Sequence, residues 1–293
     1  MEQYTIFIDI NAKIKRSVEA LRSFERKALQ MHPEGYYLCF SGGKDSQVIY
    51  ALAKMAGVKF HAYYNITTVD PPELVYFIRK EYPEVTMVPP RISMWKLIPQ
   101  KKYPPTRKVR YCCSELKERG GQGRFVITGV RWQESNNRKN RGIAEVLGPK
   151  EPKIIYLNND NDEKRRMLES CQLKGKYALN PIIDWSEDEV WLFIHQYVKK
   201  YCQLYDKGFR RLGCIGCPLA SVKQRKWELS LYPQYRRAYL RAFEKILKDR
   251  EEDGNYNRAE QWKTPEDIYK WWLYGSEKPM KQIEGQIEME LAS

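Results

Sequence analysis

The sequence has few histidines and no long apolar run. Its three histidines, His32, His61 and His195, stand apart from one another and from the cysteines, so no Ser-His-Asp or Cys-His arrangement indicates a hydrolase. No stretch reaches the length that spans a bilayer, which argues against a membrane protein. Residues 1–16 lack the basic-then-apolar order of a secretory signal. We therefore expect an intracellular, cytoplasmic protein with no membrane association.

Cysteine is present in an odd number and is missing from the C-terminal quarter. Residues 218–293 contain none of the seven. An odd count in a reducing compartment argues against a disulfide framework and favours metal binding or redox chemistry. The seven are Cys39, Cys112, Cys113, Cys171, Cys202, Cys214 and Cys217.

Positive charge is concentrated in two segments of this chain, whose net charge is +14. Residues 101–150 hold 13 Lys and Arg against four Asp and Glu, and residues 199–250 hold 14 against four. Each segment contains cysteines, so the charge predicts an anionic substrate near them. The alternative is that these are solvated helix faces that happen to be basic.

Apolar and amphipathic segments alternate along the chain. Strands are predicted at 36–40, 58–66, 85–89, 123–131 and 181–184, and helices at 11–31, 45–56, 71–82 and 185–201. This alternation is typical of an α/β fold with a doubly wound, mostly parallel sheet. We divide the chain into an N-terminal helical segment (1–33), an α/β domain (34–220) and a C-terminal helical extension (221–293).

Three polar segments follow predicted strands, at 41–46, 65–70 and 129–135. Ligands of parallel sheets bind beyond the carboxyl ends of the strands, so these segments are expected to form one site. Arg131, in the third segment, can grip phosphate oxygens with two nitrogens. The alternative for Arg131 is a salt bridge to Glu134 or a helix end.

The segment Ser41-Gly42-Gly43-Lys44-Asp45-Ser46 lies between a strand and a helix but lacks the Walker spacing. Backbone N–H groups of such a glycine turn and the positive end of the next helix favour an anion. Ser41 and Ser46 add hydroxyl donors, and Lys44 can neutralise charge. Asp45 is expected to cap the helix or to orient a metal ion.

Two cysteine pairs, Cys112-Cys113 and Cys214-Ile-Gly-Cys217, can supply four thiolates. Four thiolates suit tetrahedral zinc or an iron–sulfur cluster. Zinc is the commoner answer on spacing alone, although zinc sites rarely use adjacent cysteines. Nearby Lys and Arg lower thiol pKa values and favour ligation.

Four stretches together resemble the PP-loop ATP pyrophosphatases and, more closely, the phosphoadenosine-phosphosulfate (PAPS) and adenosine-phosphosulfate (APS) reductases. They are SGGKDS (41–46), YCCSELK (111–117), TGVRWQES (128–135) and NPIIDWSEDEVWLFI (180–194). The resemblance covers about residues 30–220. It implies an adenine nucleotide alpha hydrolase-like fold in 34–220 whose loop holds phosphate or sulfate. It also implies that a [4Fe–4S] cluster, rather than zinc, is bound by Cys112, Cys113, Cys214 and Cys217.

One departure from the reductase pattern shifts the expected reaction. Assimilatory reductases carry a C-terminal cysteine that attacks the sulfate sulfur, and no cysteine follows Cys217 here. Cys39 falls in the first predicted strand and is expected in the core. Cys171 and Cys202 show no activating neighbours. The chain is then more similar to the ATP pyrophosphatases of DNA phosphorothioation, the DndC type.

We accordingly predict an enzyme that binds ATP and Mg²⁺, cleaves ATP between the α- and β-phosphates and adenylylates a nucleic-acid acceptor for sulfur transfer. Lys44, Asp45 and Arg131 are the predicted catalytic residues, and a cysteine desulfurase or another donor would supply sulfur. The basic, aromatic segments 99–111 and 223–241 suit nucleic acid, or else pack their aromatic rings inward. The alternatives are an APS or PAPS reductase that binds adenylyl sulfate, and a non-catalytic nucleic-acid-binding subunit. Assembly as a homo-oligomer is left open.

Overall fold

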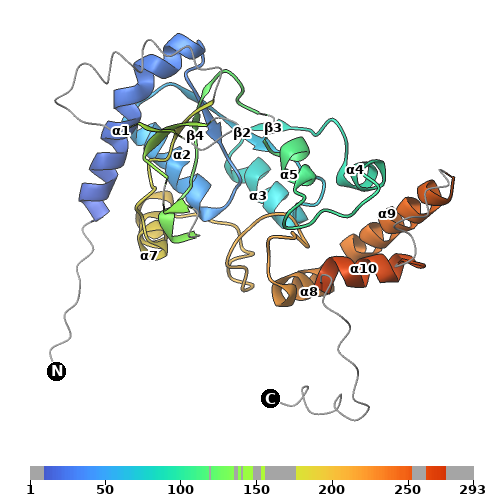
Figure 1. Cartoon of the computed structure of the whole chain (residues 1–293). Helices are drawn as coiled ribbons and strands as arrows, with labels where there is room; N and C mark the ends of the chain where they lie inside the picture. Colours follow the sequence, from blue (N-terminus) through green and yellow to red (C-terminus); the bar gives the residue numbers. More distant parts are fainter. Residues whose placement is uncertain are drawn as a thin grey trace, which may run out of the picture. The chain divides into compact units, whose positions relative to one another are not determined.

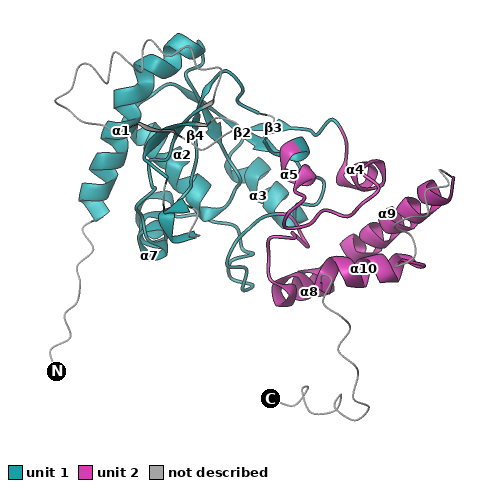
Figure 2. Cartoon of the chain, in the orientation of Figure 1, with its two compact units in different colours: residues 1–91, 115–213 teal, residues 92–114, 214–293 magenta. Residues whose placement is uncertain are grey.

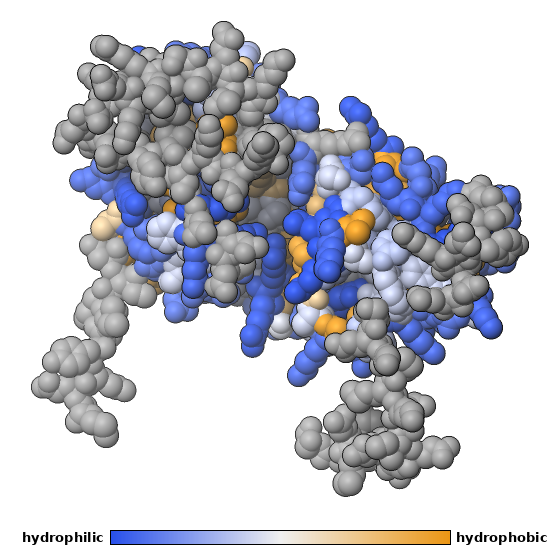
Figure 3. Space-filling view, viewed as in Figure 1, coloured by the Kyte–Doolittle hydropathy of each residue, from blue (hydrophilic) through white to orange (hydrophobic). Residues whose placement is uncertain are grey.

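The computed structural model describes residues 10–118, 120–134, 138–139, 141–147, 153–155, 176–252 and 262–274. The chain divides into two compact units (Figure 2). Unit 1 comprises residues 1–91 and 115–213, and unit 2 comprises residues 92–114 and 214–293. Across the described ranges no helix is both long enough and apolar enough to cross a membrane. Hydrophilic side chains predominate on the face shown in Figure 3, and apolar ones form small patches.

Unit 1 contains a seven-stranded sheet with the strand order β3-β2-β1-β4-β7-β5-β6 (Figure 1). The strands are β1 (Tyr36–Cys39), β2 (Phe60–Asn65), β3 (Thr86–Val88), β4 (Phe125–Ile127), β5 (Ala144–Leu147), β6 (Lys153–Ile155) and β7 (Lys176–Leu179). Neighbours from β3 to β7 are parallel, whereas β5 is antiparallel to both β7 and β6. The predicted α/β fold with a mostly parallel sheet is confirmed.

Helices of unit 1 follow the apolar periodicity of the sequence. They are α1 (Ile10–Met31), α2 (Lys44–Ala56), α3 (Pro72–Glu81) and α7 (Glu187–Phe193), with a 3₁₀ turn at Trp132–Glu134 and a π-helical turn at Ile194–Val198. The predicted N-terminal helix is confirmed, and it packs against α2. Leu21, Leu38 and Ile49, from α1, β1 and α2, are completely buried and belong to the core of this unit.

The start of α7 is fixed by a capping box. The Ser186 hydroxyl accepts from the Glu189 N–H, and the Glu189 carboxylate accepts from the Ser186 N–H. Glu189 also accepts from Lys13 Nζ at 2.8 Å, which joins α7 to α1. This arrangement places the first turn of α7 beside the phosphate loop described below.

The strand predicted at 181–184 is wrong. The strand is β7, which ends at Leu179, and residues 181–184 form turns. The N–H groups of Ile183 and Trp185 donate to the carbonyls of Asn180 and Ile182. Ile182 and Ile183 are nevertheless buried. A short buried apolar run has the same sequence pattern in a turn as in a strand, which explains the error.

Unit 2 combines a short segment before the cysteine pair with the C-terminal helices. Its helices are α4 (Met94–Gln100), the first part of α5 (Tyr111–Leu116), α8 (Val222–Leu231), α9 (Pro233–Glu252) and α10 (Pro265–Tyr274). An aromatic core joins them, because Tyr239 lies 5.1 Å from Trp95 and 4.4 Å from Trp272, measured between ring centroids. The compact units therefore divide the chain differently from the ranges 34–220 and 221–293.

Candidate functional site

The loop 41–46 follows β1 in a conformation that only glycine adopts easily at its second position. Gly42 has a φ of +74°, and a Cβ atom there would come within 2.6 Å of Ile78 and 2.7 Å of Leu74 on α3. The loop therefore lies directly on α3, and the chain turns sharply into α2. This turn directs the first N–H groups of α2 away from the sheet, where an anion can accept from them.

Hydrogen bonds within the loop hold it in this shape. Ser46 Oγ donates to the Gly43 carbonyl at 2.8 Å, and Gln47 Nε2 donates to the Gly42 carbonyl at 3.1 Å. Gln47 in turn accepts from the Tyr82 hydroxyl at 2.9 Å. Because Ser46 and Gln47 are both buried, these hydrogen bonds fix the conformation of the loop in the absence of a ligand.

Tyr205 contacts the loop and was not identified from the sequence. Its hydroxyl accepts from the Lys44 N–H at 2.8 Å. A Cβ atom added to Gly43 would lie 3.4 Å from the same hydroxyl, so the phenol lies close over the turn. Burial raises the pKa of Tyr205. Its neutral oxygen thus uses a donor that a bound phosphate would otherwise use.

Asp45 and Arg131 form a short ion pair at this site. Arg131 Nε donates to Asp45 Oδ1 at 2.6 Å, and Arg131 Nη1 donates to Gln133 Oε1 and to the Trp185 carbonyl. Arg131 is only 3% exposed. The carboxylate of Asp45 therefore orients Arg131 and does not cap α2, whose N-cap is Gly43 with no side-chain cap.

The alternative partner considered for Arg131, Glu134, has a different role. Glu134 accepts from the Arg131 backbone N–H at 3.2 Å and pairs with the Arg138 side chain. The Arg131 guanidinium is therefore held by Asp45 rather than by Glu134. The segment that carries Arg131 also lies close to Asp45, because a Cβ atom added to Gly129 would lie 3.2 Å from the Asp45 backbone.

Lys44 is nearly buried at 4% exposure, and its charge is only loosely compensated. Its Nζ lies 3.5 Å from Asp45 Oδ2 and 3.5 Å from Glu187 Oε1. Glu187 begins α7, where its backbone N–H donates to Gln133 Oε1 at 2.8 Å. Gln133 thus joins the segment after β4 to the start of α7, beside the Lys44 ammonium.

Further arginines lie near this group. Burial lowers the pKa of Arg138, and the positive charges of Arg211, Arg141 and Arg131 lower it further. These guanidinium groups therefore lie close enough to influence one another electrostatically. The edge of the sheet therefore favours an anion with several negative charges, such as a nucleotide phosphate chain.

All four cysteines predicted as metal ligands lie in unit 2, although about 100 residues separate the pairs. Cys112 and Cys113 are on α5, and the Cys217 N–H donates to the Cys214 carbonyl at 3.2 Å to close a turn. Gly216 in this turn has a φ of +71°, and a Cβ there would lie 3.0 Å from Trp272.

The thiols of this cysteine cluster interact electrostatically. The pKa of Cys112 is raised by a hydrogen bond with Cys113, by burial and by the negative charges of Cys113, Cys214 and Cys217. Among the residues described, no three Cys, His, Asp or Glu side chains have converged in a metal-binding arrangement. Four cysteine side chains are, once deprotonated, a donor set that iron or zinc accepts.

Arg225 on α8 gives a second indication of the charge at this cluster. It is 5% exposed, stacks on the Trp272 ring at 4.1 Å and donates to the Leu273 carbonyl, but its Nε and Nη2 have no hydrogen-bond partner among the described residues. Burial lowers the pKa of Arg225, and the negative charge of Cys217 opposes this shift. Unpaired buried donors beside thiolates fit a metal–thiolate group with net negative charge.

The remaining cysteines are placed as follows. Cys39 was expected in the core, and this is wrong, because it ends β1 and is exposed. Cys202 is buried, and burial raises its pKa. Cys171 lies outside the described residues. Unit 1 is thus an α/β fold with a mostly parallel sheet that brings the loop 41–46 and Arg131 together.

Comparison with known proteins agrees with this class. Residues 35–220 match the phosphoadenosine phosphosulfate reductase domain. The chain belongs to this family.

Individual relatives are distant. An uncharacterized protein of Methanocaldococcus jannaschii, MJ0973, is 26% identical over 78% of this chain and 54% of its own length. The adenosine 5'-phosphosulfate reductase of Salinibacter ruber is 26% identical over 29% of this chain and 37% of its own length. The chain thus spans about half or less of these relatives. The phosphoadenylyl-sulfate reductase of Candida auris is similar with a TM-score of 0.41 and 18% identity, covering 70% of this chain and 93% of that one.

The contact between Tyr205 and the loop leads to a prediction. Tyr205→Phe removes the acceptor that competes with phosphate for the Lys44 N–H, and we expect ATP to bind about fivefold more tightly, as for one neutral hydrogen bond. Isothermal titration calorimetry measures the change. Tyr201→Phe is the control. It removes a hydroxyl from the same segment of the chain, but this hydroxyl donates to Asp206 and not to the loop. Equal or weaker ATP binding by Tyr205→Phe would contradict the account.

Proposed function

We propose that this chain is an ATP pyrophosphatase that adenylylates a nucleic-acid phosphate and so prepares it for sulfur transfer, as in DNA phosphorothioation. The observation that carries the proposal is the meeting of Lys44, the Asp45–Arg131 pair and the loop N–H groups at one edge of the sheet. Membership of the phosphoadenosine phosphosulfate reductase domain family supports an enzyme that acts on an adenine nucleotide.

Each residue of the loop has a role in this reaction. The N–H groups of Gly42 and Gly43 bind the β- and γ-phosphates. The Lys44 N–H and the hydroxyls of Ser41 and Ser46 join them when phosphate oxygens replace the partners to which they now donate. Lys44 and Arg131 offset the charge that builds up on the leaving pyrophosphate. Asp45 positions Arg131. Mg²⁺ enters as part of the ATP complex, since this ion binds phosphates with few protein ligands.

The reaction balances without a change in oxidation state. An acceptor oxygen attacks the α-phosphorus of ATP, the bond to the β-phosphate oxygen breaks, and pyrophosphate leaves. A hydrosulfide nucleophile then displaces AMP from the activated acceptor. If a cysteine desulfurase delivers sulfur as a persulfide, a second thiol must release the carrier cysteine by forming a disulfide with it.

The cysteine cluster is proposed to hold a [4Fe–4S] group, with zinc as the alternative. Cys112, Cys113, Cys214 and Cys217 would be its ligands, and Arg225 would offset its charge. Such a cluster supplies a redox-active or sulfur-binding centre when bound. Tyr239 supports the turn that carries two of the ligands, because its hydroxyl donates to the Ile215 carbonyl at 3.0 Å.

A second candidate function is the reduction of adenylyl sulfate to sulfite. The match to the reductase domain favours it, and so does the partial sequence similarity to the Salinibacter ruber enzyme. It needs a cysteine nucleophile, and Cys39 is exposed next to the loop. A third candidate is a nucleic-acid-binding subunit that retains the fold without catalysis.

Product analysis separates these functions. With ATP, Mg²⁺, nucleic acid and hydrosulfide, we expect equal amounts of pyrophosphate and AMP, because hydrosulfide displaces AMP from the adenylylated acceptor. Lys44→Ala should lower the rate about a hundredfold because a charge at the leaving group is lost. Lys54→Ala is the matched control, since Lys54 is on the exposed side of α2 and pairs with Glu84. Sulfite formed from APS or PAPS, with no pyrophosphate from ATP, would support the reductase instead. Neither product would support the non-catalytic subunit.

Metal analysis tests the cysteine cluster independently. After anaerobic purification we expect about four iron and four sulfide per chain, with broad visible absorption. Cys214→Ser should lower the iron content, whereas Cys202→Ser should not, because Cys202 is a buried residue of unit 1 and the four cysteines belong to unit 2. One zinc per chain without visible absorption would falsify the iron–sulfur assignment.

A further inference from the structure

Helix α8 has two different faces. Arg225, Glu228 and Leu229 are buried, and Glu228 accepts from the Gly216 N–H at 2.9 Å, so this face lies on the turn of the cysteine cluster. The opposite face of α8, together with Tyr274 of α10, lines an open groove of about 550 Å³. The α8 residues that line it are Val222, Lys223, Lys226, Trp227 and Ser230. The groove therefore belongs to the same helix as the supports of the cluster.

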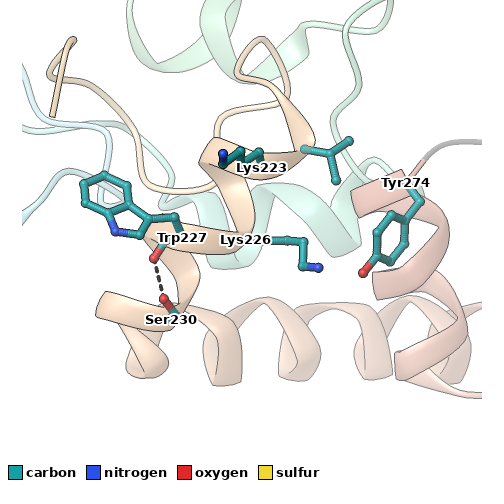
Figure 4. Close-up of a pocket in the computed structure, with 6 residues that line it drawn as sticks. Lys223, Lys226, Trp227, Ser230 and Tyr274 are labelled. Atoms are coloured by element: carbon teal, nitrogen blue, oxygen red, sulfur yellow. Dashed lines mark hydrogen bonds between the residues drawn. The ribbon is translucent and has the colours of Figure 1, made fainter. Parts of the chain in front are cut away.

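The composition of this groove is unusual for the outer face of a surface helix, which is ordinarily polar throughout. Val222 is 38% exposed and Tyr274 is 48% exposed. Figure 4 shows Lys226 of α8 extending toward the Tyr274 ring of α10, and the ammonium lies 5.9 Å from the ring centroid. The residues that line the groove include two lysines and no carboxylate. Exposed aromatic surface beside cationic groups is therefore concentrated here.

A second cation–aromatic pair also involves α10. The Arg236 guanidinium at the start of α9 lies 5.4 Å from the Tyr269 ring of α10. Arg236 and Arg237 are both exposed. Positive charge thus continues from the groove onto α9, and the sequence segment 199–250 has the excess of Lys and Arg noted above. A ligand with regularly repeated negative charges matches this surface better than a protein with a mixed surface.

We propose that this groove, defined by Lys223, Lys226, Trp227 and Tyr274, binds single-stranded nucleic acid. Lys223 and Lys226 contact phosphates, and the half-exposed Tyr274 ring stacks on a base. Stacking on aromatic rings beside a cationic track is the usual means of binding single strands without sequence preference. The inference rests on the nucleic-acid acceptor of the proposed function and assigns that acceptor to α8 and α10.

Fluorescence anisotropy with a labelled 20-nucleotide strand tests the groove in the full-length protein. The double variant Lys223→Gln/Lys226→Gln should raise Kd about tenfold at 0.1 M salt. It should also reduce the slope of log K against log salt by about 1.4, since each phosphate contact on a single strand contributes about 0.7. Lys245→Gln/Lys248→Gln removes the same charge from α9, where both lysines pair with carboxylates outside the groove. This control should keep Kd within about twofold.

An aromatic variant separates stacking from charge. Tyr274→Ser should raise Kd about tenfold and leave the salt slope unchanged, because a stacking contact releases no counterions. Tyr274 is suited to this test because it is half exposed at the end of α10, so its replacement leaves the core intact. Parallel DNA and RNA strands show which of the two the groove prefers.

Two results would overturn the proposal. One is equal binding by the groove double variant and the α9 control. The other is an unchanged Kd for Tyr274→Ser, together with equal displacement of the labelled strand by heparin in all variants. That result would mean that the surface binds anions in general. Failure of the proposed function is distinguishable, because it appears as missing pyrophosphate release in the wild-type protein. The groove is measured by binding in the absence of ATP.

Discussion

The ion pair between Asp45 and Arg131 is the constraint on which the site in unit 1 depends. It joins the first turn of α2 to the segment after β4, two elements that are 86 residues apart. A guanidinium that is 3% exposed needs such a partner, because an unpaired buried charge costs several kcal/mol. Once Arg131 is fixed, Gln133 and the Trp185 carbonyl are fixed with it, and the start of α7 is held beside Lys44.

The two units separate two kinds of chemistry. Unit 1 carries the loop and the arginines, and its sheet directs them to the carboxyl ends of β1 and β4. Unit 2 carries the four cysteines and the groove of α8 and α10. In unit 2 a single helix, α8, supports the cysteine turn through Glu228 and presents lysines to solvent on its other face. This arrangement accounts for the concentration of positive charge near the cysteines without requiring the cysteines themselves to bind the anion.

The sequence was informative where local chemistry decides structure and less so where distant contacts do. The helices predicted at 11–31 and 45–56 and the mostly parallel sheet follow from periodicity and turn residues, and they are observed as α1 (Ile10–Met31), α2 (Lys44–Ala56) and the sheet of unit 1. The turn at 181–184 and the exposure of Cys39 were predicted wrongly, because burial of a short apolar segment is set by the whole fold. Tyr205 could not be found, since no local pattern indicates that a tyrosine 161 residues away accepts from Lys44. The grouping of residues 92–114 with the C-terminal helices depends on aromatic packing for the same reason.

The central claim is that Asp45 acts on the nucleotide through Arg131. The most direct test is the ATP dissociation constant of Asp45→Asn, Arg131→Gln and the double variant, with folding checked by circular dichroism. If the claim holds, each single variant binds ATP about tenfold or more weakly, and the double variant is no weaker than the worse single one, since both remove the same contact. ATP affinity that is unchanged in Asp45→Asn, or losses that simply add in the double variant, would contradict it.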